Sequence, residues 1–247
     1  MLDAICCEFM KLRKSYFYPT VLSVLCFLPV FLYLVWLGQG QPVEWSKYIP
    51  KIEVMAILTT YTPMFSVVSA YIFTREFSNN IATVVYAYPV SRIKIFLSKL
   101  VFLGAFMILA YFLQLLFIIV GGLLVTHEVL TQSILITILK ANMYSLIFQY
   151  AIIPVSILIA LLFKKITASI VYSGIVTIIN INLMRGGAEK IYDYAPMFYP
   201  LLSIEALRGK IPIGLDGGLQ TRIIIAALTF ITGITVCIIY YLKADVN

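Results

Sequence analysis

Side chains that could perform catalysis are scarce in this sequence. The only histidine, His127, stands beside Glu128 in a short polar stretch, whereas a catalytic triad or a metal site needs several such groups together. The sequence contains no His-Glu-x-x-His and no Gly-x-Ser-x-Gly motif. It therefore predicts a protein that is not an enzyme, with no catalytic residues and no metal site.

The chemistry of nucleotide binding is also missing from the sequence. A phosphate-binding loop needs the pattern G-x-x-x-x-G-K-[ST], in which glycine amides surround the phosphates and the lysine neutralises them. The glycine-rich stretches Gly121-Gly122, Gly186-Gly187 and 214–218 lack the Lys-Ser or Lys-Thr pair that should follow. We expect that this chain binds no cofactor itself, and that any ATP and Mg²⁺ it uses are held by a partner chain.

The remaining candidates are polar side chains inside long apolar runs. They could line a substrate path, or they could form hydrogen bonds between helices, each worth about 0.6–2 kcal/mol in a membrane. Both interpretations stay open for this set, whose members are Thr60, Gln114, Asn142, Gln149 and Asn180. No paired carboxylates lie within a run, which argues against a proton relay or an intramembrane carboxylate site.

The elements that must position these side chains are membrane helices. The chain has 247 residues, of which 62% are hydrophobic and 12% charged, whereas soluble domains have roughly 45–50% and about 25%. Crossing a bilayer takes about 20 apolar residues, and the runs that meet this length are Val21–Leu37, Ile52–Phe73, Leu100–Val125, Asn142–Phe163, Ile166–Met184 and Ile223–Leu242. We therefore predict an all-α membrane protein, one domain over residues 1–247 built as a six-helix bundle, in which Pro63 interrupts the second apolar run and could kink its helix.

Two further segments lie outside the predicted spans. Residues 1–18 place Ile5, Phe9 and Leu12 on one helical face, which predicts an amphipathic helix in the membrane interface. The polar residues of this interface helix include Glu8, Lys11, Arg13 and Lys14. Residues 185–222 contain several charges and three prolines, and each charge buried at the centre of a span would cost about 2.5–3.5 kcal/mol. We expect this segment to stay outside the membrane.

The distribution of charge predicts the orientation of the bundle. If both termini are cytoplasmic, the inner segments carry ten basic and four acidic residues, and the outer segments carry eight basic and seven acidic residues. Short loops rich in Lys and Arg are typical of the cytoplasmic side. We therefore expect a multi-pass protein of the cell membrane with both termini in the cytoplasm. Its net charge of +7 reflects this topology, and no binding to nucleic acid is expected.

The loop between the second and third runs combines helix caps with a helix stop. Ser78 and Asn79 are good N-cap residues. Pro89 disfavours helix at the residue before it, and Ser91 can cap the helix that follows. Between these signals, residues 80–87 carry apolar side chains at three- and four-residue spacing, which predicts a short cytoplasmic helix across the inner face of the bundle.

This loop resembles the permease subunits of ABC-2-type transporters. The similarity lies in Arg75-Glu76-Phe77, Asn79-Asn80-Ile81-x-Thr83, Tyr88-Pro89-Val90-Ser91-Arg92 and Ser98-Lys99, and the stretch Glu8-x-x-Lys11-Leu12-Arg13-Lys14 also resembles the N-terminal helix of that family. Within the family, the chain is most similar to the bacitracin and lantibiotic self-immunity permeases. The layout is similar over the whole chain, whereas the specific motif covers residues 71–99.

The resemblance implies a role for each of these segments. Residues 75–99 would be a cytoplasmic coupling-helix loop that docks on a separate ABC ATPase, residues 1–18 the interface helix, and residues 185–222 external or re-entrant helices. The residues implied in coupling are Arg75, Glu76, Phe77, Asn79, Asn80, Pro89 and Arg92. The working unit would contain two ATPase subunits and two permeases, the second permease being identical to this chain or related to it.

Two functions follow from these implications. The first is a bacterial exporter, driven by ATP on its partner, that moves an amphipathic or lipid-associated substrate such as a peptide antibiotic and so gives resistance or immunity to bacitracin or a lantibiotic. The alternative is a membrane protein without a transport cycle that sequesters or senses such a peptide. An inactive ATPase would abolish the first activity and would leave the second unchanged.

Overall fold

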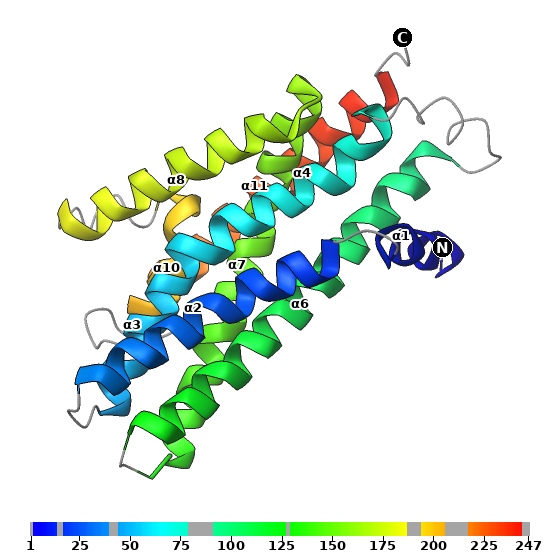
Figure 1. Ribbon diagram of the computed structural model, residues 1–247. Coiled ribbons are helices and arrows are strands. Elements are labelled where there is room, and N and C mark those ends of the chain that lie inside the picture. The colour runs from blue at the N-terminus through cyan, green and yellow to red at the C-terminus, as the bar shows by residue number, and fades with distance from the viewer. Residues whose placement is uncertain are drawn as a thin grey trace.

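The protein is an elongated bundle of long helices (Figure 1). The computed structural model describes residues 2–13, 17–39, 44–78, 91–126, 129–186, 194–205 and 217–243. Within these ranges the chain is almost entirely helical and forms no strand. Six of the described helices are long and apolar enough to cross a membrane, which confirms the predicted fold class.

The helices follow one another along the chain with short connections. In order, they are α1 (Leu2–Arg13), α2 (Phe17–Gln39), α3 (Trp45–Met55), the π-helical turn η1 (Ala56–Tyr61), α4 (Thr62–Ser78), α6 (Arg92–Val125), α7 (Gln132–Phe163), α8 (Ile166–Gly186), the 3₁₀ turn η2 (Pro196–Phe198), α10 (Tyr199–Glu205) and α11 (Gly217–Lys243). Because α3, η1 and α4 are continuous, they form one span together. The predicted cap of the third span is also present, since the Ser91 hydroxyl accepts a hydrogen bond from the backbone N–H of Lys94.

The two ends of the bundle can be told apart by the elements that they contain. Helix α1 and the last turn of α11 lie at one end, which we call the α1 end (Figure 1). The start of α3 and the turn between α6 and α7 lie at the opposite end, which we call the Trp45 end. The first and last described helices therefore reach the same end of the bundle, whereas the side of the membrane that this end faces stays a prediction.

The second span and α7 occupy the centre of the bundle. Helix α7 packs against α4, α8, α10 and α11, and α4 also packs against α8. The second span is mostly buried, whereas α2, α8 and α11 are mostly exposed. Their exposed faces carry large apolar side chains such as Phe27, Ile178 and Ile231. Such faces suit contact with lipid or with another membrane protein.

Small polar side chains join the central helices. The hydroxyls of Ser69 on α4 and Ser156 on α7 are 2.9 Å apart. Ser156 also donates to the carbonyl of Ser66 at 3.3 Å, and Ser169 on α8 donates to the carbonyl of Ser156 at 3.1 Å. In a membrane, where hydrophobic association is weak, hydrogen bonds and close packing of this kind hold helices together.

Close packing at the Trp45 end depends on two glycines of α6. A Cβ atom on Gly121 would lie 2.6 Å from the hydroxyl oxygen of Tyr48, and one on Gly122 would overlap the ring of Trp45. Both aromatic side chains are buried and come from the first turn of α3. The pair Gly121-Gly122 therefore serves the packing of α6 on α3.

The second span begins earlier than predicted. The helix begins at Trp45, so Lys47 and Lys51 belong to it and not to an outer loop. The helix continues through Pro63, which interrupts the predicted apolar run. In the π-turn, hydrogen bonds reach back five residues, and the carbonyl of Leu58, which has no N–H partner at Pro63, accepts from the Thr177 hydroxyl at 3.3 Å. A neighbouring helix thus compensates for the missing donor, as is common for proline in membrane helices.

Candidate functional site

The apolar core of the bundle is divided in two near Glu53. A smaller apolar cluster fills the Trp45 end and includes Trp45, Ile49 and Ile138. A larger one begins at Val54 on this span and extends to the α1 end. Buried polar groups gather where the larger cluster begins, and Tyr61 and Tyr111 are also part of that cluster. We name five of these residues the Glu53 cluster: Glu53, Tyr61, Tyr111, Asn142 and Ser145.

The Glu53 cluster joins three spanning segments through buried polar contacts. The carboxyl of Glu53, which is 1% exposed, accepts a hydrogen bond from Nδ2 of Asn142 at 2.8 Å. The hydroxyls of Tyr111 on α6 and Ser145 on α7 are 3.2 Å apart. The rings of Tyr61 and Tyr111 are in contact, with centroids 4.3 Å apart, and both tyrosines lie within electrostatic range of Glu53. The cluster therefore places one carboxyl group and several hydroxyl and amide groups deep inside a membrane protein.

The π-turn η1 explains how Glu53 and Tyr61 come to share a face of their helix. Residues seven apart in an α-helix lie within about 20° of each other around the helix axis, whereas residues eight apart are separated by about 80°. A π-turn accommodates one extra residue, so Tyr61, eight residues after Glu53, takes the place that the seventh residue would have in a regular helix. Functional sites are common at such turns.

Several polar atoms at this level have no hydrogen-bond partner within the described part of the chain. They are Oε2 of Glu53, the hydroxyl of Tyr61 and both amide atoms of Gln114. The Tyr111–Ser145 contact sets the register of the antiparallel helices α6 and α7, and this register places Gln114 at the level of Asn142. Orphaned polar groups of this kind are costly in a membrane and are typical of functional positions.

The structure divides the residues predicted for the substrate path. Gln114 and Asn142 lie at the Glu53 cluster, and Gln149 is buried on the same face of α7, two turns beyond Asn142. Asn180 lies apart from them and donates to the carbonyl of Met197 at 3.2 Å. Thr60 lies elsewhere again, in the wall of a side groove. Hydrogen bonding between elements thus accounts for Asn142 and Asn180, whereas Gln114 has no such bond within the described residues.

The side groove lies between α2 and the second span. It has a volume of about 550 Å³ and is lined mainly by apolar side chains, with threonine hydroxyls at intervals. Its walls include Thr20 and Val24 from α2, and Thr60 and Met64 from the second span. The groove runs past Tyr71 toward the α1 end of the bundle.

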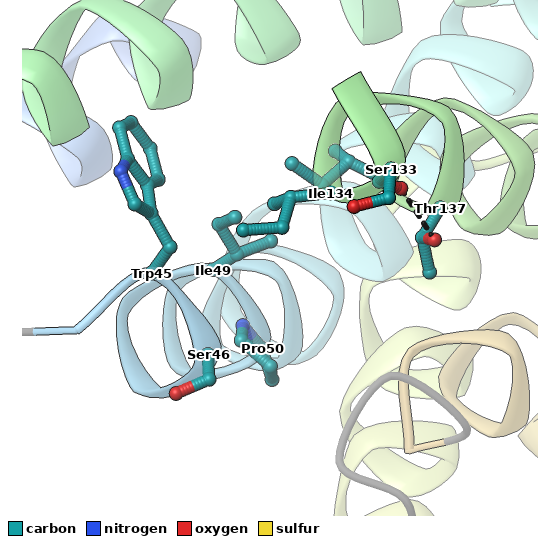
Figure 2. A pocket seen from close by; sticks show the side chains of 8 residues that line it. Trp45, Ser46, Ile49, Pro50, Ser133, Ile134 and Thr137 are labelled. Carbon is teal, nitrogen blue, oxygen red and sulfur yellow. Dashed lines mark hydrogen bonds between the residues drawn. The ribbon is translucent and has the colours of Figure 1, made fainter. Parts of the chain in front are cut away.

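A second, smaller pocket opens at the Trp45 end, between α3 and the start of α7 (Figure 2). It has a volume of about 230 Å³. Figure 2 shows Trp45, Ile49 and Pro50 on one wall and Ile134 and Thr137 on the other. Ser46, Ser133 and Ile138 complete the lining. Glu53 and Asn142 follow Ile49 and Ile138 by four residues on their helices, so the pocket lies one helical turn from the Glu53–Asn142 hydrogen bond.

The residues implied in coupling gather at the α1 end. Arg75, at the end of α4, donates from Nη1 to the carbonyl of Lys11 on α1 at 3.2 Å and lies over the ring of Tyr71. Arg92, at the start of α6, donates from Nη1 to the carbonyl of Leu242 on α11 at 3.1 Å. The end of α4 and the start of α6, which flank residues 79–90, are therefore each joined to another helix.

The rest of the predicted coupling and interface residues divide between described and undescribed parts of the chain. Glu76 and Phe77 belong to the last turn of α4, and Arg13 ends α1. Glu8 and Lys11 form an ion pair of 2.7 Å within α1, with Glu8 buried and Lys11 exposed. Asn79, Asn80, Pro89 and Lys14, together with the predicted helix 80–87, lie outside the described residues, as do His127 and Glu128.

The candidate residue that sequence reasoning did not single out is Glu53. No paired carboxylates were expected within a span, and this single carboxyl is buried inside a spanning helix. Two signals were present in the sequence: Glu53 is the second residue of one predicted apolar run, and Asn142 is the first residue of another. Only the structure shows that these two positions meet, because they are separated by 89 residues.

Comparison with known proteins places the chain in a family. Residues 4–180 match the sequence profile described as ABC-2 family transporter protein. The chain therefore belongs to this family, and it is a membrane component of a transporter. It is similar to the bacitracin transport permease protein BCRB of Bacillus licheniformis, with 23% identity over 210 residues that cover 83% of this chain and 95% of that protein.

Proposed function

We propose that the protein is the permease subunit of an ATP-driven exporter whose ATP and Mg²⁺ bind to a separate ABC ATPase. The observation that carries this proposal is that the two helix ends flanking residues 79–90 are each joined to another helix. Arg75 ties one end to α1, and Arg92 ties the other to α11. A displacement of this segment by a partner would therefore move α1 and α11 together with α4 and α6.

The proposed assembly contains two ATPase subunits and two permeases in a bacterial cell membrane. The α1 end faces the cytoplasm in this arrangement, so that segment 79–90 and α1 both meet the ATPase. The second permease is a copy of this chain or a relative. Apolar faces on α2, α8 and α11 are available for it and for lipid.

The proposed substrate is an amphipathic peptide antibiotic, of which bacitracin is the first to test. Bacitracin is chosen because it appears in the name of the similar Bacillus licheniformis protein. In this chain, the groove of about 550 Å³ between α2 and the second span supports it, because apolar walls with threonine hydroxyls fit a molecule that is partly apolar and partly polar. A groove on the side of the bundle also allows a substrate to enter from the bilayer.

The proposal is tested by purifying the tagged chain from its own membranes in mild detergent, identifying the chains that accompany it, and assaying bacitracin resistance. We expect a stoichiometric ATPase with a phosphate-binding loop. The double variant Arg75→Ala/Glu76→Ala should still insert in the membrane and should lose resistance, while its partner still hydrolyses ATP. Lys94→Ala, which changes an exposed side chain near the same loop, is the matched control.

Two results would contradict the proposal. Full resistance in the double variant would remove the coupling role of Arg75 and Glu76. Resistance that persists with an ATPase-inactive partner, or a chain that purifies without any nucleotide-binding protein, would favour a protein that sequesters or senses the peptide without a transport cycle.

A further inference from the structure

Within the part of the chain that the structure describes, the carboxyl of Glu53 has no cation to balance a negative charge. Its neighbours in the cluster are the hydroxyls of Tyr61 on η1, Tyr111 on α6 and Ser145 on α7, and the amide of Asn142. Gln114 of α6 adds another neutral amide at this level. No ion pair to Glu53 is formed by the residues that the structure describes.

The charged groups closest to Glu53 along its own helix are directed elsewhere. Lys51 is exposed, and its ammonium lies over the ring of Trp36 at 5.0 Å from the centroid. Lys47 pairs with Glu44 at 3.3 Å on the exposed first turn. Helix α10, which also packs on α3, presents the buried residues Tyr199, Leu201 and Leu202. An ionised carboxyl without a cation is very costly in an apolar medium, and such a group binds a proton instead.

The hydrogen bond from Asn142 is compatible with a carboxyl that gains and loses a proton. The amide Nδ2 donates to Oε1 of Glu53 whether or not the other oxygen is protonated, because Oε1 keeps its acceptor capacity in both forms. The proton would then reside on Oε2, which has no other partner within the described residues. The cluster thus holds the carboxyl in position and leaves one oxygen free to exchange.

The pocket at the Trp45 end provides a route for this exchange. Its wall includes Ile49 and Ile138, which are 3% and 2% exposed and precede Glu53 and Asn142 by one helical turn. A small separation of α3 and α7 at these two isoleucines would therefore bring water from the pocket to Oε2 of Glu53.

We propose that Glu53 is an intramembrane proton-binding site, neutral in the conformation described here, which exchanges its proton with water through the pocket at the Trp45 end. This inference needs only a membrane-spanning chain and does not depend on the identity of the exported substrate. The proton is then a ligand of the protein, and its binding couples the separation of α3 and α7 to the pH at the Trp45 end.

Infrared spectroscopy of the purified full-length chain in lipid nanodiscs tests the protonation state. We expect the wild-type chain at neutral pH to show the carbonyl stretching band of a protonated carboxyl, and Glu53→Gln to lack that band. Glu53→Asp should retain a protonated-carboxyl band at a shifted position, which keeps the test valid if Glu53→Gln folds poorly. A difference between wild type and Glu53→Gln that contains only carboxylate bands would overturn the proposal.

Glu44→Gln is the matched control for this measurement. Glu44 is the exposed N-cap residue of α3, and hydrogen bonds from Lys47 and Ser46 lower its pKa, so it is a carboxylate at neutral pH. Its replacement should remove carboxylate bands and leave the protonated band unchanged. Loss of the protonated band in Glu44→Gln would show that the band does not belong to Glu53.

Transfer into D₂O tests the route, because deuterium on the carboxyl shifts the same band and gives an exchange rate. Ile138→Ala should accelerate exchange by about tenfold or more, since the loss of core methyl groups weakens local closure. Leu139→Ala, next to it in sequence but on the exposed face, should leave the rate unchanged. Equal rates in Ile138→Ala and wild type would overturn the assigned route.

Discussion

At the scale of single residues, the contact between Asn142 and Glu53 matters most. These side chains form the closest link between the second span and α7 in the Glu53 cluster. When a buried acceptor loses its donor, the hydrogen bond is lost. The acceptor also stays shielded from water without a partner, which costs its full desolvation free energy. Asn142 therefore contributes to stability as well as to the position of the carboxyl.

Asn142→Ala should lower the free energy of unfolding by about 1–3 kcal/mol. The measurement is thermal unfolding of the detergent-solubilised chain. Asn182→Ala is the control, because Asn182 is exposed on α8 and donates only to a carbonyl of its own helix, at 3.0 Å. Equal melting temperatures for Asn142→Ala and wild type would show that the contact adds nothing to stability.

At the scale of helices, the fit of α6 on α3 and its link to α11 can each be tested by one substitution. Gly122 leaves room for the ring of Trp45, whereas Gly174 on α8 has no heavy atom within 4 Å of the position that a Cβ would take. Arg92 links the start of α6 to the end of α11. These contacts concern the relative placement of helices and not their formation.

Gly122→Ala should destabilise the chain by about 1–3 kcal/mol, because overpacking forces the neighbouring ring and backbone to move. Gly174→Ala should instead stabilise it by about 0.5–1 kcal/mol, since alanine favours the helical conformation and meets no neighbour there. Thermal unfolding of both variants checks the pair. A common sign for the two changes would contradict the packing described here.

Arg92→Ala should weaken the coupling of ATP hydrolysis to resistance while leaving insertion intact, because α6 loses its tie to α11. Resistance per unit of ATPase activity, measured in cells with equal membrane levels of the protein, is the quantity to compare. Lys94→Ala, two residues later and exposed, should behave as wild type. Equal resistance per unit of ATPase activity in Arg92→Ala and Lys94→Ala would contradict a coupling role for Arg92.

The presence of six spanning helices was predictable from the sequence, whereas the start of the second span and its irregular turn were not. Runs of apolar residues define spans by length alone, and all six were found this way. The start of the second span at Trp45 was not predicted, because Lys47 and Lys51 interrupt the apolar pattern before Ile52. The Glu53 cluster depends on contacts between distant helices and on the extra residue in η1, which no periodicity in the sequence reveals.

At the scale of the whole molecule, the described structure fixes which helix ends lie together, and the next question is which side of the membrane each end faces. Cys6 and Cys7 are exposed on α1, and Val129 is 87% exposed between α6 and α7 at the opposite end. These positions allow labelling from one side of the membrane to decide the orientation.

With a membrane-impermeant maleimide and intact cells, Val129→Cys should be labelled, and the native Cys6 and Cys7 should react only after permeabilisation. The expectation follows from the charge distribution, which places short Lys- and Arg-rich loops in the cytoplasm. Labelling of Cys6 and Cys7 in intact cells, with none at position 129, would reverse the orientation. A Cys6→Ser/Cys7→Ser background assigns the label to the new cysteine.

The π-turn in the second span allows the part of the helix beyond it to rotate about the helix axis. A helix with one extra residue can be wound in two ways, and removing the bulge turns everything beyond it by about 100°, the angle of one residue in an α-helix. For the second span, the part beyond η1 is α4, which carries Arg75 in its last turn. A rotation of α4 imposed at the α1 end would therefore turn Tyr61 away from the face of Glu53. Movement at one end of the bundle would in this way change the polar contacts of the Glu53 cluster near the other end.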